Sequence, residues 1–184
     1  MKKYLILTLF ALLSAQCHRY TKINMKHKFN FYTEYHQFYI EDSKYKSQTD
    51  PLSFWDEEAF LSGLAIDNGI LGISTKSYGN IKGEIEILDK PNDIIKSDLY
   101  DHIVEGGINI ESGELQILSC TSRDIGINLK VPVGKYRIRI YGSNFASVKE
   151  PDLANDTDND YYRIELWKSD DMERKVLKKY DFNQ

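Results

Sequence analysis

The chain has 184 residues, of which 41% are apolar and 12% aromatic, a composition that suits one folded domain and excludes an intrinsically disordered chain. Residues 1–28 hold six Lys and Arg and no acid, so residues 29–184 hold 18 bases against 28 acids, a formal charge of −10. This charge argues against a nucleic-acid binder, which needs a basic surface, and favours a basic partner or high solubility.

The first residues have the layout of a bacterial export signal. A basic start precedes the apolar run 5–13, and small or polar residues then lead to Cys17. The apolar run is too short to cross a membrane as a stable helix. Cys17 stands like the cysteine of a bacterial lipoprotein signal, which is lipidated and becomes the first residue, although Gln16 occupies a position where a small residue is usual. We therefore expect export, with a lipid anchor on Cys17.

These features divide the chain into a signal peptide over residues 1–17, a basic linker over residues 18–28 and a folded domain over residues 29–184. The lipid anchor would be the domain's contact with a membrane. Two alternatives stay open. The protein could be secreted without lipidation, or translation could begin at Met25 and leave it in the cytoplasm.

The folded domain begins with a segment rich in aromatic residues. Residues 29–40 alternate in part and predict one long strand, and residues 44–51 predict a polar loop. Residues 55–63 predict a short helix, because acids in the first turn suit the helix dipole and Gly63 can end it.

From residue 69 onward, apolar and polar residues alternate in short segments. Gly106 and Gly107 indicate a break, and Ser112 and Gly113 a tight turn. Together with residues 29–40, strands are expected over residues 69–75, 81–87, 100–104, 115–119, 125–131, 136–141, 162–167 and 176–180. The spacing predicts an all-β fold, an antiparallel β-sandwich of about eight or nine strands with one short helix near residues 55–63.

The sequence lacks the short motifs of common catalytic and cofactor sites, such as a nucleophile elbow, a phosphate-binding glycine loop or a zinc-protease helix. Of the four histidines, only His36 and His102 lie within the predicted domain, and no Cys and His cluster has the spacing of zinc ligands. We expect no catalysis, no metal and no cofactor. A nucleophile pair of Cys120 with either histidine, and a Cys17–Cys120 disulfide, are the minor alternatives.

An acidic loop follows the predicted strand 136–141. Residues 156–160 resemble the opening of a calcium-binding loop, but the glycine and the closing glutamate of an EF-hand are missing. A solvated loop that presents carboxylates to a basic protein is the favoured interpretation. Its candidate partner-binding residues are Glu150, Asp152, Asp156, Asp158 and Asp160.

Four stretches occur in an order and spacing that resemble the bacterial competence protein J family: residues 35–38, residues 55–60 with Gly63, residues 107–112, and residues 131–136. The resemblance covers residues 35–141 well and the last strands loosely. The residues that carry its main motifs are Tyr35, His36, Gln37, Phe38, Trp55, Gly63, Gly134 and Tyr136.

The resemblance implies a non-enzymatic protein that blocks a DNA-entry nuclease, which suits the acidic domain because a nuclease presents a basic cleft to DNA. The export signal and the acidic stretch of residues 150–160 depart from the family pattern. Two other functions stay open. One is a surface lipoprotein that binds a carbohydrate or other small ligand through its many aromatic residues. The other is a hydrolase with an unrecognised site.

Overall fold

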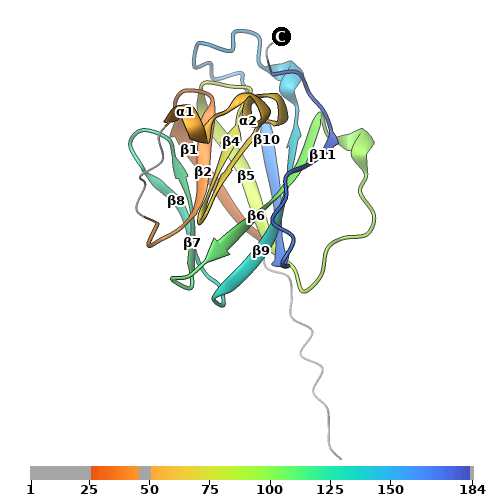
Figure 1. The fold of residues 1–184 in the computed structure, drawn as a ribbon. Coiled ribbons are helices and arrows are strands. Elements are labelled where there is room, and N and C mark those ends of the chain that lie inside the picture. The colour runs from red at the N-terminus through yellow and green to blue at the C-terminus, as the bar shows by residue number, and fades with distance from the viewer. Residues whose placement is uncertain (1–25, 46–50, 183–184) are drawn as a thin grey trace, which may run out of the picture.

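Two β-sheets pack face to face in the computed structural model, which describes residues 26–45 and 51–182 (Figure 1). The six-stranded sheet has the order β1 (Lys26–Thr33), β5 (Gly79–Ile87), β10 (Tyr161–Lys168), β9 (Gly134–Ser143), β6 (His102–Ile110) and β11 (Lys175–Lys178). The five-stranded sheet has the order β3 (Leu64–Asp67), β4 (Ile70–Ser74), β2 (Gln37–Asp42), β7 (Glu114–Ser119) and β8 (Ile125–Lys130). The predicted all-β sandwich is confirmed.

The described residues form eleven strands, more than the eight or nine expected. One reason is that β3 was missed, because Leu64–Asp67 is too short to show alternation. The pairing also differs in one place, since β10 runs parallel to β5 while every other pair is antiparallel. The reason is the long connection over residues 88–101, which returns the chain so that β6 runs in the same direction as β5; β9 and β10 then follow as antiparallel neighbours, which leaves β10 parallel to β5.

Two boundary predictions were wrong for physical reasons. Residues 29–40 form two strands, β1 and β2, which lie in different sheets. Gly106 and Gly107 do not break a strand but lie within β6, where neighbouring side chains approach the backbone. A Cβ atom on Gly106 would lie 2.8 Å from Ile66 Cδ1, and one on Gly107 would lie 2.4 Å from the Met172 Cα. These glycines therefore serve close packing and not a turn.

Small helical elements cap one end of the sandwich. The helices α1 (Pro51–Phe54) and α2 (Glu57–Ser62) lie at the same end as the loop before β10, and the predicted helix near residues 55–63 corresponds to α2 (Figure 1). Two 3-10 turns, η1 (Ser97–Leu99) and η2 (Phe145–Ser147), complete the regular structure. Within the part of the chain that the structure describes, no helix is long and apolar enough to cross a membrane.

The core lies between the sheets, where inward-facing side chains of alternate residues interdigitate. Ile40 and Ile117 from one sheet, and Ile81 and Ile164 from the other, have no exposed surface. Burying a side chain of this size stabilises the fold by roughly 1.5–3 kcal/mol. The core therefore fixes the two sheets and the loops at their ends.

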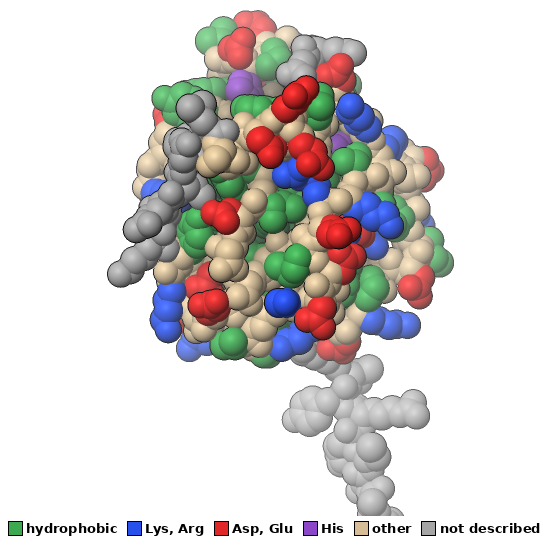
Figure 2. Space-filling view, viewed as in Figure 1, with side chains coloured by type: hydrophobic (Ala, Val, Ile, Leu, Met, Phe, Trp, Pro, Cys, Tyr) green, Lys and Arg blue, Asp and Glu red, His purple; other side chains and the backbone are tan. Residues whose placement is uncertain are grey.

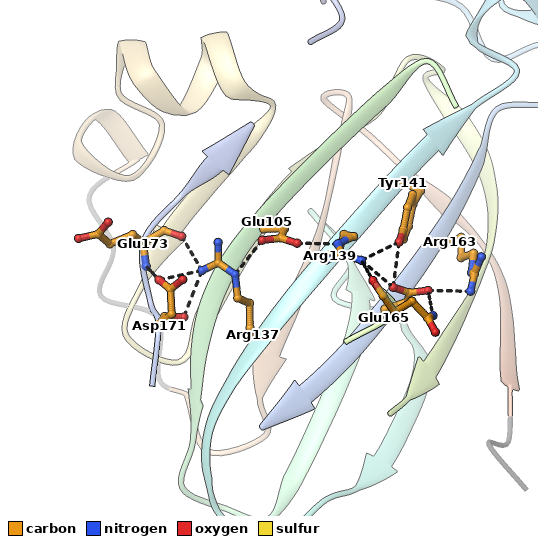
Figure 3. A network of polar contacts seen from close by, with 9 residues as sticks. Glu105, Arg137, Arg139, Tyr141, Arg163, Glu165, Asp171 and Glu173 are labelled. Carbon is orange, nitrogen blue, oxygen red and sulfur yellow. Dashed lines mark hydrogen bonds and ion pairs between the residues drawn. The ribbon is translucent and has the colours of Figure 1, made fainter. Parts of the chain in front are cut away.

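The outer face of the six-stranded sheet carries buried charges, although its alternating sequence suggests a solvated face. Glu105 on β6 accepts from Arg137 Nε at 2.9 Å and Arg139 Nε at 2.5 Å, both on β9 (Figure 3). Glu165 on β10 continues the network to Arg163, 2.7 Å away. Asn92 covers this face because its carbonyl oxygen accepts from Arg139, and Asp171 and Glu173 cover it because their carbonyl oxygens accept from Arg137. The network therefore has a structural role, because it holds these covering segments against the sheet.

Candidate functional site

A cleft of about 590 Å³ opens at the end of the sandwich that carries α1 and α2. The turn between β1 and β2, the α1–α2 segment, the chain after β4 and the start of the acidic loop all contribute to its walls. The described residues that line it are Tyr35, His36, Gln37, Trp55, Phe60, Ser74, Thr75, Lys76, Pro151, Asp152 and Phe182. Segments far apart in sequence thus meet at one concave site, which is the usual place for ligand or partner binding.

The turn between β1 and β2 places two side chains at the cleft under backbone strain. Tyr35 and His36 have φ angles of +56° and +53°, a left-handed conformation that normally favours Gly or Asn. Tyr35 is 66% exposed. His36 Nε2 lies 3.4 Å from Asp152 Oδ1, and its ring meets the Tyr78 ring edge-on at 5.7 Å. Strain at such residues is typical of functional sites.

Helix α2 holds the opposite wall. Asp56 caps its start by accepting from the Ala59 N–H at 2.7 Å, and Gly63 ends it with a left-handed φ of +66°. The six residues between these caps turn Phe60 outward, where it is 57% exposed. Trp55 lies between Phe54 and Phe60, with ring centroids 5.9 and 5.5 Å away. The two caps therefore fix an aromatic wall.

Two polar atoms of the cleft residues are enclosed by the protein. Gln37 Oε1 and Trp55 Nε1 have almost no accessible surface, and Gln37 Oε1 has no hydrogen bond within the described residues. Burial raises the pKa of Tyr39, and a side-chain hydrogen bond with Trp55 acts against this rise. A buried polar atom without a partner costs about 1–3 kcal/mol. Neither atom is open to an external group, so the accessible part of the cleft is its aromatic and charged lining.

A buried lysine forms part of the cleft. Lys76 is 7% exposed, and its ammonium lies 5.4 Å from the centroid of the Tyr180 ring. Its backbone N–H donates to the Tyr162 hydroxyl at 2.9 Å. The aromatic contact partly offsets the desolvation of the charge, and the segment after β4 is thereby fixed to β10.

The acidic loop divides into inward and outward carboxylates. Asp160 is 1% exposed and accepts from Ser77 N, Ser77 Oγ and the Tyr162 hydroxyl at 3.1, 2.7 and 2.7 Å. Asp158 is also buried and accepts from the Asn155 N–H, and burial with help from Asp160 and Glu150 raises its pKa. These two carboxylates serve the fold and do not reach the surface.

Glu150, Asp152 and Asp156 are exposed and remain candidates for partner binding. Of these, Asp152 lines the cleft. Within residues 26–45 and 51–182, no group of three or more acidic, His or Cys side chains is placed to hold a metal ion. Within the calcium-like residues 156–160, the carboxylates of Asp158 and Asp160 accept hydrogen bonds from Asn155 and from Ser77 and Tyr162.

The residues of the family motifs separate into two sets. Tyr35, His36, Gln37 and Trp55 line the cleft. The other set maintains the fold: Phe38 is a core residue, Gly63 ends α2, Gly134 has a φ of +143° at the start of β9, and the buried Tyr136 donates its hydroxyl proton to the Pro132 carbonyl. Phe60, which lies within the motif stretch of residues 55–60, also lines the cleft. So does Lys76, which sequence reasoning did not single out.

The described contacts give no support to a cysteine–histidine nucleophile. Cys120 Sγ lies 3.5 Å from the Tyr39 hydroxyl. His102 Nε2 lies 2.9 Å from the Ser62 carbonyl, and His102 Nδ1 accepts from the Tyr180 N–H. Burial lowers the pKa of His102 to about 4 and keeps the ring neutral. Cys17 lies outside the described residues, so its lipidation and pairing stay predictions.

Comparison with known proteins extends this description. No family model and no curated protein matches the chain. A solved structure of ComJ from Bacillus subtilis, described as an inhibitor of the DNA-degrading activity of NucA, matches 80% of this chain and 99% of its own at 16% identity, with a TM-score of 0.59. The structure of the product of crocagin biosynthetic gene J matches 78% of this chain and 97% of its own at 13% identity, with a TM-score of 0.46. The chain therefore has a ComJ-like fold.

Proposed function

We propose that this protein is a non-enzymatic inhibitor that binds a basic DNA nuclease, as a divergent member of the competence protein J family. The observation that carries the proposal is the ComJ-like fold, which extends over 80% of the chain. The ComJ structure is that of a nuclease inhibitor. Four of the residues in the family motifs meet at one cleft, which gives the shared fold a site for recognition.

The charge of the domain supports the same proposal. A nuclease binds DNA through a basic surface, and residues 29–184 hold 18 bases against 28 acids. Opposite charges steer the encounter and make association slower as salt rises. Some of these acids serve the fold internally, as Asp160 and Glu165 do, so only the exposed carboxylates can take part.

The proposal is tested by DNA hydrolysis assays with two nucleases. One is a nuclease encoded beside the gene of this protein, and the other is NucA, the target of the structural neighbour. We expect the purified chain to inhibit the first in a saturable complex, with association that slows steeply between low and physiological salt. The proposal would be refuted if both nucleases still hydrolyse DNA fully when this protein is present in excess.

The proposed cellular location is the bacterial cell envelope, with a lipid anchor on Cys17 at the end of an export signal. The nuclease would then be met outside the cytoplasm. Labelling of wild-type cells and of Cys17→Ser cells with a palmitate analogue tests this directly. Label in the wild type alone supports the anchor. Absence of label with a processed chain indicates ordinary secretion, and an unprocessed chain beginning at Met25 places the protein in the cytoplasm.

A second candidate function is binding of a carbohydrate by an exported lipoprotein. The observation in its favour is the aromatic lining of the cleft, where Tyr35 is 66% and Phe60 57% exposed. Calorimetric titration with bacterial cell-wall oligosaccharides tests it. Saturable binding that is lost in Tyr35→Ala would support this function, and the absence of heat with every oligosaccharide would remove it.

A further inference from the structure

Large apolar side chains are exposed around the mouth of the cleft. Tyr35 and Phe60 belong to its lining, and Leu153 follows the lining residue Asp152. Their exposed fractions are 66%, 57% and 61%. Tyr32, whose ring meets Tyr78 edge-on at 6.4 Å, extends this set. We call the cleft with these four side chains the aromatic end. Exposed apolar residues gathered at one site indicate a binding surface.

Exposed carboxylates lie on the segments that form the aromatic end. Asp152 lines the cleft, Glu57 begins α2, and Asp156 belongs to the acidic loop whose start lines the cleft. The Asp152 side chain is 97% exposed, so its contact with His36 leaves most of the carboxylate accessible. Figure 2 shows acidic and hydrophobic side chains next to each other at the upper end of the molecule, where Figure 1 places α1 and α2. An apolar centre with an acidic rim fits a basic protein partner.

The accessible side chains of the cleft indicate which part of a partner enters. Tyr35 and Phe60 present exposed aromatic rings, and Asp152 presents an exposed carboxylate. An exposed loop of a basic protein supplies apolar side chains and an Arg or Lys side chain within a few residues. A neutral sugar can stack on an aromatic ring but carries no positive charge for Asp152. The combination of rings and carboxylate therefore favours a protein loop.

We infer that the aromatic end is the docking surface for an exposed loop of a basic protein. Apolar parts of the loop pack on Tyr35 and Phe60, next to Gln37 and Trp55 in the lining of the cleft. An Arg or Lys side chain of the loop pairs with Asp152. The identification of the partner as a nuclease rests on the proposed function, whereas the surface and its chemistry rest on the residues described above.

The first test measures the affinity of the inhibited nuclease for matched variants of the full chain. Phe60→Ala and Asp152→Lys alter the aromatic end. Leu99→Ala and Asp98→Lys make the same changes on η1, where both residues are exposed away from the cleft lining. We expect each cleft variant to weaken binding by about tenfold or more, as hot-spot substitutions do, and each η1 variant to change it by less than about threefold.

The outcomes separate the docking surface from the proposed function. If the wild type inhibits the nuclease and the cleft variants bind it as tightly as the wild type, the docking surface is refuted and nuclease inhibition stands. If the wild type inhibits no nuclease, the proposed function fails, and a second measurement then decides about the surface.

That second measurement is an NMR titration of the full chain with three probes at millimolar concentration. They are a capped Gly-Arg-Gly peptide, its Gly-Glu-Gly analogue and chitotriose. We expect the arginine peptide alone to shift the indole N–H signal of Trp55 and the side-chain amide signals of Gln37. Shifts caused by chitotriose or by the glutamate peptide instead, or no shift with any probe, would overturn the inference.

Discussion

Tyr35 is expected to lower the stability of this protein while it serves binding. Its φ of +56° places a bulky aromatic residue in the left-handed region, which costs roughly 1–2 kcal/mol relative to a residue suited to that region. Asn adopts this conformation more readily than Tyr. Because Tyr35 is 66% exposed, the substitution Tyr35→Asn removes little packing in return. We therefore expect Tyr35→Asn to raise the free energy of unfolding by roughly 0.5–1 kcal/mol.

Urea denaturation at pH 7 measures this change as a shift of the midpoint at constant slope. In a thermal scan, the same change raises the melting temperature by roughly 1–4 °C for a chain of this size. Tyr32→Asn is the control, because Tyr32 is 45% exposed but lies in β1, where Asn disfavours the strand. This control should be destabilised. A Tyr35→Asn protein that is less stable than the wild type would refute strain at this turn.

Three further predictions concern the buried polar groups. Asp160→Ala should lower the free energy of unfolding by roughly 2–4 kcal/mol, because it leaves the donors of Ser77 and Tyr162 unpaired. Asp156 is exposed, so Asp156→Ala should change the free energy of unfolding by less than about 0.5 kcal/mol. The urea midpoints of the two variants test the difference. Glu105→Ala should lower the free energy of unfolding by roughly 3–5 kcal/mol, because it leaves Arg137 and Arg139 without their shared carboxylate. A urea midpoint equal to that of the wild type would contradict a structural role of this network. His102 should destabilise the fold in acid, because its pKa of about 4 in the folded state lies below the ordinary 6.5. The contribution of the neutral ring to the free energy of unfolding is complete above pH 6.5. It is lost as the pH falls towards 4 and below, by up to roughly 3 kcal/mol. His102→Gln should flatten this part of the stability–pH curve, and an unchanged slope would show that other groups cause it.

The alternation of apolar residues was enough to predict the class of fold. It works for segments such as β5, where Ile81 and Ile85 point into the core and Lys82 and Glu84 point away. It failed at Tyr35 and His36, because aromatic residues are typical of strands and nothing in their sequence marks a left-handed turn. Position in the sheets, and not local sequence, decides that the chain crosses between layers there.

The candidate site was predicted only in part, because proximity in space depends on the topology. The motif residues Tyr35, Gln37 and Trp55 meet at the cleft, but their neighbour Lys76 emerges only from the fold. The acidic loop shows the same limit. Its sequence gives five similar carboxylates, whereas burial distinguishes Asp160, which binds Ser77, from the exposed Asp152. No periodicity within a loop reports which carboxylates turn inward.

The central claim, that this protein binds and blocks a basic nuclease, is tested most directly by one titration. The purified chain is added to a fixed amount of the nuclease encoded beside its gene, and the rate of DNA hydrolysis is measured at low and at physiological salt. The account predicts loss of hydrolysis at a defined stoichiometry, with slower association at higher salt. An unchanged rate of DNA hydrolysis when this protein is present in excess, at both salt concentrations, would contradict the claim.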